Sequence, residues 1–127
     1  YHNHCEEFAK LPDGRRPMDI LKEGLDPKNT AFVLDTYWIQ YGGGDVRRWI
    51  EELYGRISVL HLKDMGIHGE TPFYAEIGQG NLYWEGILDA AEKAGVAYYV
   101  VEQDECPGDP FESLRLSSEY LHKHFMR

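Results

Sequence analysis

Three short apolar segments of the chain end in a side chain that could bind a metal ion. These side chains are Asp35, His61 and Glu102, and each follows a valine by two positions. Because side chains alternate between the two faces of a strand, each valine and its potential ligand point the same way, with apolar layers beneath a polar rim. At the start of the chain, His2 and His4 also share one face of an extended segment. If these segments lie side by side, their ends bring imidazoles and carboxylates into one small space.

Carboxylates combined with imidazoles form a mixed oxygen and nitrogen site that suits a divalent cation. We expect Mn²⁺ first, with Co²⁺, Zn²⁺ or Mg²⁺ as alternatives. The set holds no thiolate, which argues against a closed structural zinc site and favours an open, catalytic one. Taken singly, the same residue types also have structural roles at strand ends, where an Asp caps the next helix and a His forms hydrogen bonds.

The elements that must position these residues are four β-rich segments, each followed by a helical pattern. The strands are expected at residues 1–5, 31–35, 57–61 and 96–102, where apolar, β-branched and aromatic residues are concentrated. Their continuous apolar runs predict strands that are covered on both faces. A strand followed by a helix, four times over, predicts a parallel sheet whose loops gather at the carboxyl ends of the strands.

Helix boundaries are marked by capping residues, prolines and glycines. The first helix is expected to begin at Pro17 and to end at Gly24. Asp45, Asn81 and Asp109 are expected to cap the three later helices.

Composition limits the classes of partner. The chain has 127 residues, 22 acidic and 13 basic side chains and a net charge of −9, which disfavours nucleic acid and anionic membrane surfaces as partners. No apolar run is long enough to cross a membrane. The two cysteines, Cys5 and Cys106, match no zinc-binding spacing, so we expect reduced thiols in a cytoplasmic protein. Because the chain opens with Tyr1, directly on a string rich in polar chemistry, we expect it to be a segment of a larger protein.

Five motifs, YHNHCEEF, FVLDTYW, VLHLKD, EIGQGNLYW and YYVVEQDE, resemble the C-terminal half of the sugar phosphate isomerase/epimerase family, the xylose isomerase-like TIM barrels. The resemblance spans essentially the whole chain. It implies an α/β fold in which residues 1–127 form one partial domain, units five to eight of a (β/α)8 barrel.

The resemblance also implies a set of site residues. Asp35, His61 and Glu102 match three of the four metal-ligand positions of the family. The fourth is generally a Glu near the end of the fifth strand, where this chain has histidines at positions 2 and 4. Three alternatives stay open: a His replaces that Glu, Glu6 or Glu7 reaches into the site, or the ligand set is altered.

In related epimerases, two metal-bound glutamates act as acid and base at a carbon next to a carbonyl, and Glu102 matches one of them. We assign catalysis to Glu102, His4 and Lys63. Lys63 shares the face of His61 and could stabilise an oxyanion. We assign substrate binding to His2, Glu7, Trp38 and Glu76.

Glu76 opens a Gly-rich loop, residues 76–81, at a predicted helix start. Free N–H groups there could hold an anion or a sugar hydroxyl. The alternative is a turn that needs two flexible residues.

The function expected from the resemblance is a divalent-metal-dependent isomerase or epimerase acting on a sugar or a sugar phosphate. Alternatives are an inosose dehydratase-type lyase on the same barrel and a non-catalytic sugar-binding barrel. A related barrel, the abasic-site DNA endonuclease, is disfavoured by the net charge of −9. Because half a barrel leaves sheet edges uncovered, the expected partner is the N-terminal half of the barrel or a second copy of the chain.

Overall fold

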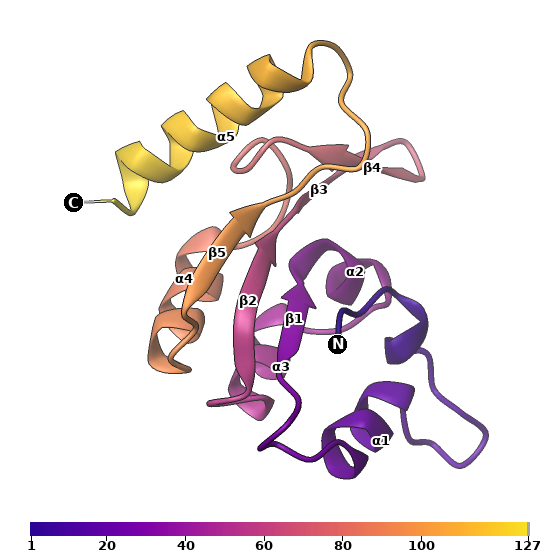
Figure 1. Cartoon of the computed structure of the whole chain (residues 1–127). Helices are drawn as coiled ribbons and strands as arrows, with labels where there is room; N and C mark the ends of the chain where they lie inside the picture. The colour runs from indigo at the N-terminus through magenta and orange to yellow at the C-terminus, as the bar shows by residue number, and fades with distance from the viewer. Residues whose placement is uncertain (127) are drawn as a thin grey trace.

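The apolar segments of the sequence pair as a parallel sheet in the computed structural model, which describes residues 1–126 (Figure 1). The sheet has the order β1-β2-β5, with β1 at Phe32–Asp35, β2 at Ile57–Leu62 and β5 at Tyr98–Val101. Both pairings are parallel, and their register sets Asp35 beside His61 and His61 beside Val100. The expected strands at residues 31–35, 57–61 and 96–102 are therefore confirmed, with shifts of one or two residues at their ends.

The expected first strand, residues 1–5, is reduced to a single parallel bridge between His2 and Val33. The backbone turns away after it, because Cys5 precedes a short 3-10 helix, η1 (Glu6–Phe8). The Glu7 carboxylate stabilises this turn by accepting from the backbone N–H of His4 at 2.8 Å. The bridge still places the start of the chain next to β1.

The helices of the chain are α1 (Pro17–Gly24), α2 (Thr36–Tyr41), α3 (Val46–Glu52), α4 (Trp84–Lys93) and α5 (Pro110–His124). Asp45 and Asp109 cap α3 and α5 as expected, by accepting from backbone N–H groups of the first turn. The expected cap of α4 is wrong, because Tyr83 takes that position. Asn81 instead uses its backbone N–H to bond to the carbonyl of Met65.

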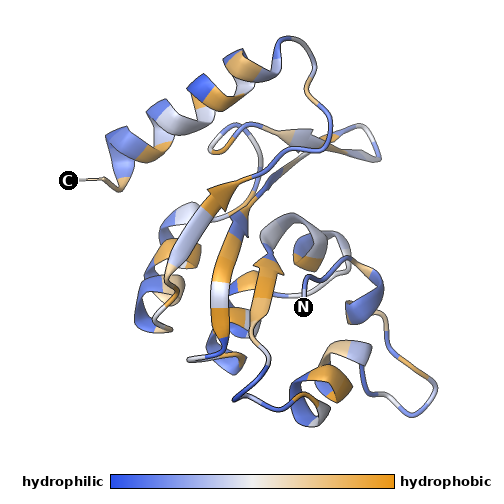
Figure 2. Cartoon of the chain, viewed as in Figure 1, coloured by the Kyte–Doolittle hydropathy of each residue, from blue (hydrophilic) through white to orange (hydrophobic). Residues whose placement is uncertain are grey.

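One face of the sheet is covered by α3 and α4, which lie behind it in Figure 1. The side chains on that face are fully or almost fully buried; they are Phe32, Leu34, Leu60 and Leu62. Strand β1 and much of β2 are hydrophobic, β5 is hydrophobic toward its carboxyl end, and α5 is mixed (Figure 2). The main core therefore lies between the sheet and this pair of helices.

The opposite face of the sheet is not covered by a helix of the described residues, which corrects the expectation of two covered faces. Val33 and Val59 are half-buried there and Val100 is 45% exposed. The apolar runs are real, but the alternation along each strand sends their valines to this open face. The sheet therefore has one face packed against helices and one face that carries partly exposed valines.

A hairpin, β3 (Asp64–His68) and β4 (Thr71–Ala75), follows β2 directly and was not expected from the sequence. Together with α2 it lies at the carboxyl end of the sheet, where the loops were expected to gather (Figure 1). No helix in the part of the chain that the structure describes meets the length and hydropathy needed to cross a membrane. Both cysteines are free, and a cytoplasmic location stays a prediction.

Candidate functional site

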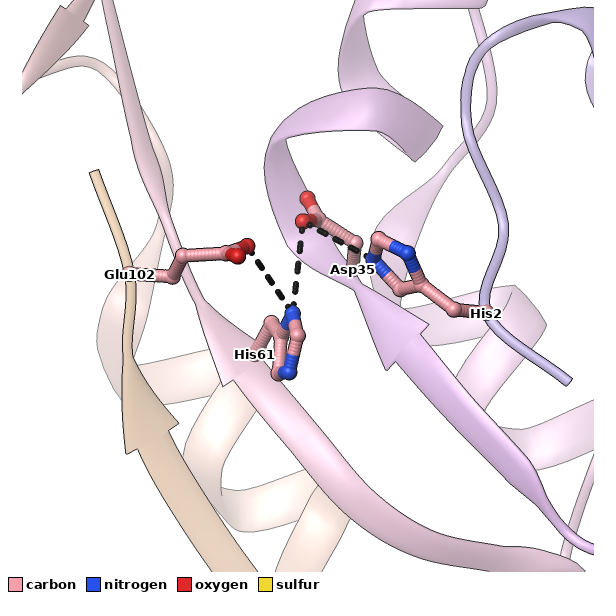
Figure 3. A group of neighbouring side chains, drawn as sticks. All are labelled: His2, Asp35, His61 and Glu102. Carbon is pink, nitrogen blue, oxygen red and sulfur yellow. Dashed lines mark hydrogen bonds and ion pairs between the residues drawn. The ribbon is translucent and has the colours of Figure 1, made fainter. Parts of the chain in front are cut away.

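Four side chains meet at the carboxyl end of the sheet: His2, Asp35, His61 and Glu102 (Figure 3). We refer to them as the four-ligand group. The Asp35 carboxylate lies 3.4 Å from His2 Nε2 and 3.8 Å from His61 Nδ1, which in turn lies 2.9 Å from Glu102 Oε2. One ligand atom from each residue lies within 4.8 Å of those of the other three. The sequence pattern thus correctly brought Asp35, His61 and Glu102 together.

Asp35 is the most tightly positioned member of the group. Its side chain is fully buried, and its Oδ1 caps α2 by accepting from the Trp38 N–H at 3.1 Å. The Asn3 side chain accepts from the Asp35 backbone N–H at 2.9 Å, which fixes the first segment against β1. The capping role considered for a strand-end Asp is therefore present in Oδ1, while Oδ2 faces His2, His61 and Lys63.

The donor set fits a divalent cation. Among the described residues, His61 Nδ1 is buried and forms no hydrogen bond, although it lies 2.9 Å from the Glu102 carboxylate. A buried nitrogen without a hydrogen bond is costly, and a metal ion would satisfy its lone pair. Two imidazole nitrogens and two carboxylates match the preferences of Mn²⁺, Co²⁺ and Zn²⁺.

His2 joins the group from the segment where the resemblance led us to expect a glutamate, so the geometry favours the first of the three alternatives, a His in place of that Glu. Glu7 does not reach into the group, because its carboxylate accepts from the Tyr1 hydroxyl and from the His4 backbone N–H. His4 is exposed beside it, with ring centroids 5.0 Å from His2 and 5.3 Å from Trp38.

Lys63 lies against the group from the side of the sheet. Its side chain is only 2% exposed, and Nζ lies 3.6 Å from Asp35 Oδ2, 3.3 Å from Glu102 Oε2 and 2.7 Å from Asp104 Oδ2. The sequence analysis missed Asp104, which lies in a bend beyond the end of β5. The single ammonium group therefore forms ion pairs with three carboxylates.

Three aromatic rings enclose the same ammonium group. Lys63 Nζ lies 5.3 Å from the ring centroids of Trp38 and Tyr74 and 6.0 Å from that of Tyr37. Cation–π attraction adds to the ion pairs. Trp38, assigned to substrate binding from the sequence, thus packs between Lys63 and His4 at the edge of the group.

The charges around Lys63 shift the ionisation of its neighbours. Burial and the neighbouring carboxylates act in opposite directions on the pKa of Lys63, and the carboxylates prevail and raise it. Burial acts to raise the pKa of both Glu102 and Asp104, but the positive charge of Lys63 outweighs it and lowers both. Burial raises the pKa of Asp35, with Lys63 opposing it. Glu102 is therefore an ionised carboxylate at neutral pH.

Glu76, also assigned to substrate binding from the sequence, lies outside the four-ligand group. Its carboxylate accepts from the Ser113 hydroxyl at 2.7 Å and so fastens α5 to the loop that precedes α4. The role expected for Glu76 stays a prediction, and the bond it forms here is structural.

Asp64 is a second buried carboxylate that the sequence analysis did not single out. It accepts from the backbone N–H groups of Gly78, Gly80 and Leu82 and from the Trp84 indole at 2.7 Å. The N–H groups of the loop expected to hold an anion or a sugar hydroxyl are therefore bonded to a carboxylate of the chain itself. A Cβ on Gly80 would lie 2.3 Å from Asp64 Oδ1, so this glycine is required by close approach.

No protein-family model matches the chain. An inosose dehydratase of Geobacillus thermodenitrificans is 24% identical over an alignment 139 residues long. The alignment covers 95% of this chain and 46% of that protein. A crystal structure of a sugar phosphate isomerase/epimerase from Parabacteroides distasonis superposes with a TM-score of 0.81 and 28% identity, over 99% of this chain and 45% of that one. A second such structure from the same organism superposes with a TM-score of 0.79 and 26% identity, with the same coverage.

These relatives confirm the resemblance and the fold expected from the sequence. The structural neighbours of the chain are sugar phosphate isomerase/epimerases, and the chain has the α/β architecture of half a TIM barrel. It spans about half the length of the relatives it matches.

Proposed function

We propose that this chain carries the metal-binding half of an isomerase or epimerase, which moves a proton at a carbon next to a carbonyl of a sugar. The observation that carries the proposal is the four-ligand group at the carboxyl ends of parallel strands, with the buried, unbonded nitrogen of His61 at its centre. TIM-barrel enzymes place their chemistry at this end of the strands.

His2, Asp35, His61 and Glu102 would hold the ion, for which Mn²⁺ is the first expectation and Co²⁺, Zn²⁺ or Mg²⁺ the alternatives. A bound divalent cation supplies Lewis acidity, which polarises the carbonyl oxygen and acidifies the neighbouring C–H bond. His2 thereby moves from the substrate-binding role expected from the sequence to a ligand role.

The remaining steps fall to side chains of the chain itself. Glu102 is ionised and 37% exposed, so its carboxylate can accept a proton from a substrate carbon. His4 is exposed beside the group and is our candidate for returning a proton from another direction. Lys63 is 2% exposed and is held by three carboxylates, so in this proposal it fixes the position of Glu102, and the oxyanion contact expected from the sequence stays a prediction. The indole of Trp38 offers a flat apolar face to a sugar ring.

Metal binding tests the proposal without any assay of activity. We expect the purified chain to retain about one Mn²⁺ per molecule after dialysis, as measured by elemental analysis and by electron paramagnetic resonance. Glu102→Gln is expected to weaken Mn²⁺ binding by about tenfold or more. Glu105→Gln makes the same change of charge on an exposed residue of the same loop and serves as the control. Equal Mn²⁺ affinity in the two variants would refute the assignment.

A lyase is the second candidate, favoured by the similarity to an inosose dehydratase. Both reactions begin with removal of a proton next to a carbonyl, but the lyase then expels a neighbouring hydroxyl group as water. Proton nuclear magnetic resonance in D₂O separates them when a panel of keto-sugars and keto-inositols is used. Replacement of one carbon-bound proton by deuterium without loss of a hydroxyl group would indicate the isomerase. Loss of a hydroxyl group as water would indicate the lyase.

We further propose that four more βα units complete the barrel, supplied by an N-terminal half or by a second copy of the chain. Support comes from the open face of the sheet and from β5, whose Tyr98 is 68% exposed. Next to β5, an open groove of about 830 Å³ is lined by residues of β5, α4 and α5. Light scattering measures whether a second copy of the chain completes the barrel, in which case a dimer is expected. A monomer that exposes no dye-binding apolar surface would contradict the proposal that further βα units complete the barrel. Sugar binding without turnover in the completed barrel would favour the non-catalytic alternative.

A further inference from the structure

Asn3 is a buried polar side chain to which the proposed function gives no role. It is 1% exposed, it directly follows His2 in the chain, and it bonds to the backbone of Asp35. The amide of an asparagine offers one acceptor oxygen and two N–H donors. Because buried polar groups are hydrogen-bonded, the partners of this amide show what it holds in place.

The pairing of the first segment, residues 1–5, with β1 begins as an ordinary parallel ladder. The Val33 N–H donates to the Tyr1 carbonyl at 2.8 Å, and His2 pairs with Val33. In a parallel ladder the next donor on this side of β1 is the Asp35 N–H, and its backbone acceptor would be the carbonyl of Asn3. Instead, Oδ1 of the Asn3 side chain accepts from the Asp35 N–H at 2.9 Å. A side chain therefore continues the ladder at the point where the backbone of the first segment turns away.

The nitrogen of the same amide also bonds to Asp35. Asn3 Nδ2 donates to the Asp35 carbonyl at 3.4 Å, so one side chain holds both backbone polar groups of Asp35. Asp35 is fully buried, so its N–H needs an acceptor within the chain. Removal of the Asn3 amide would leave that N–H without its acceptor and would release the first segment from the end of β1.

These bonds fix the distance between two ligands that come from different segments. His2 Nε2 lies 3.4 Å from Asp35 Oδ2, and the His2 ring centroid lies 4.8 Å from that of His61. His2 is held by a single bridge, whereas Asp35 and His61 belong to regular strands. A side chain that locks the first segment to the Asp35 backbone therefore determines where His2 meets the rest of the four-ligand group.

We propose that Asn3 is a positioning residue of the four-ligand group, which ties the segment that carries His2 to the backbone of Asp35 and so preorganises both ligands for one divalent cation. Asn3 itself is not a ligand and acts through His2 and Asp35. The inference deepens the proposed function and rests on it for the presence of the ion. The placement of His2 by Asn3 is a property of the chain by itself. Loss of a residue that orients a metal ligand weakens metal binding by about 10- to 100-fold.

The first test needs no metal. In the metal-free, isotopically labelled chain, we expect nuclear Overhauser effects between the rings of His2 and His61, and we expect Asn3→Ala to lose them. Asn3→Asp keeps the acceptor oxygen and is expected to retain them. Ser117→Ala is the matched control, because the Ser117 hydroxyl is also buried and accepts from a backbone N–H, that of Ile77 at 3.0 Å. Effects that persist in Asn3→Ala, or that are lost equally in Ser117→Ala, would overturn the proposal.

The wild-type chain alone supplies a second measurement. A scalar coupling across the hydrogen bond is expected between the backbone nitrogen of Asp35 and Cγ of Asn3. Couplings across the backbone bonds between β1 and β2 serve as the internal reference. Absence of the first coupling in the presence of the reference couplings would overturn the proposal, whether or not Asn3→Ala folds.

Metal binding tests the consequence, with Zn²⁺ as a diamagnetic probe. In the wild-type chain saturated with Zn²⁺, one imidazole nitrogen of His2 and one of His61 are expected to take the ¹⁵N chemical shift of a metal-bound nitrogen. In Asn3→Ala we expect only His61 to do so, and the Zn²⁺ affinity to fall by about tenfold or more, whereas Ser117→Ala keeps both signals. Unchanged affinity and an unchanged His2 signal in Asn3→Ala would overturn the proposal.

Failure of the proposed function has a different signature. It would appear as a wild-type chain that binds neither Zn²⁺ nor Mn²⁺. The ring contacts of His2 and the coupling between Asp35 and Asn3 are measured without metal, so they would still decide whether Asn3 positions His2.

Discussion

The hydrogen bond between the Trp84 indole and Asp64 allows a sharp test of how the loop before α4 is held. Trp84 is 1% exposed and Asp64 is fully buried, and their bond measures 2.7 Å. A hydrogen bond to a charged group contributes about 1.5–3 kcal/mol to stability when both partners are buried. Trp84→Phe removes the donor and keeps most of the ring volume. We therefore expect it to lower the free energy of unfolding by about 2–4 kcal/mol, with packing contributing the remainder.

A double-mutant cycle isolates the bond from the packing loss. Urea unfolding at pH 7 is measured for wild type, Trp84→Phe, Asp64→Asn and the double variant. The expected coupling energy is about 1.5 kcal/mol or more, because each single variant breaks the same charge-assisted bond. Trp49→Phe is the matched control, since Trp49 is buried in the same core and bonds to no carboxylate of the described residues. A coupling energy below about 0.5 kcal/mol, or equal losses for the two tryptophan variants, would refute the reasoning.

Three further perturbations have defined outcomes. A hydrogen bond from Lys22 lowers the pKa of Glu52, so the unfolded chain binds more protons than the folded chain. The stability that this pair gives above the unfolded pKa of about 4.3 is therefore lost on acidification. Glu52→Gln should flatten the dependence of unfolding free energy on pH between about 6 and 3, by no more than about 1 kcal/mol. Lys63→Met leaves a fully buried carboxylate without its counter-ion and should cost about 3–5 kcal/mol in urea unfolding, and a loss under 1 kcal/mol would contradict the ion-pair network. Gly80→Ala forces a Cβ to within 2.3 Å of a buried carboxylate oxygen and should lower the thermal midpoint by several degrees, whereas Gly24→Ala meets no atom within 4 Å and should leave it unchanged or raise it.

The part of the site that the sequence predicted depends on local alternation. Asp35, His61 and Glu102 each follow a valine by two positions, and the strand pleat alone is enough to send them to one face. The parallel register then aligns Asp35 with His61. Asp104 lies in a bend beyond the end of β5, so strand alternation alone does not place it.

The choice between His2 and His4 could not be made from the sequence, because both lie on the same face of an extended segment. The single bridge between His2 and Val33 decides it, since it places His2 next to β1 and lets the backbone turn before His4 can approach the group. That turn depends on the Glu7 carboxylate and on Asn3, whose side chain bonds to the Asp35 backbone. A contact between residues distant in sequence, such as that of Asn3 with Asp35, leaves no periodic signal in the sequence.

The hairpin after β2 was missed for a related physical reason. Residues 64–75 contain Gly66 and Pro72, which are unfavourable in strand interiors, so propensity argues against both strands. Gly66 is tolerated because the Phe73 ring of the facing strand occupies the space beside it, so close that a Cβ would lie 2.2 Å from the ring. Packing across the hairpin thus compensates for the poor local preference.

The consecutive residues Lys63 and Asp64 show how one short stretch of chain organises both the site and its surroundings. Lys63 follows His61 by two positions and therefore faces the four-ligand group, where its charge stabilises three carboxylates. Asp64 faces the opposite way and collects the N–H groups of the loop before α4. The position of Lys63 beside the four-ligand group and the hydrogen bonds of the loop before α4 are thus both set by one short stretch of backbone.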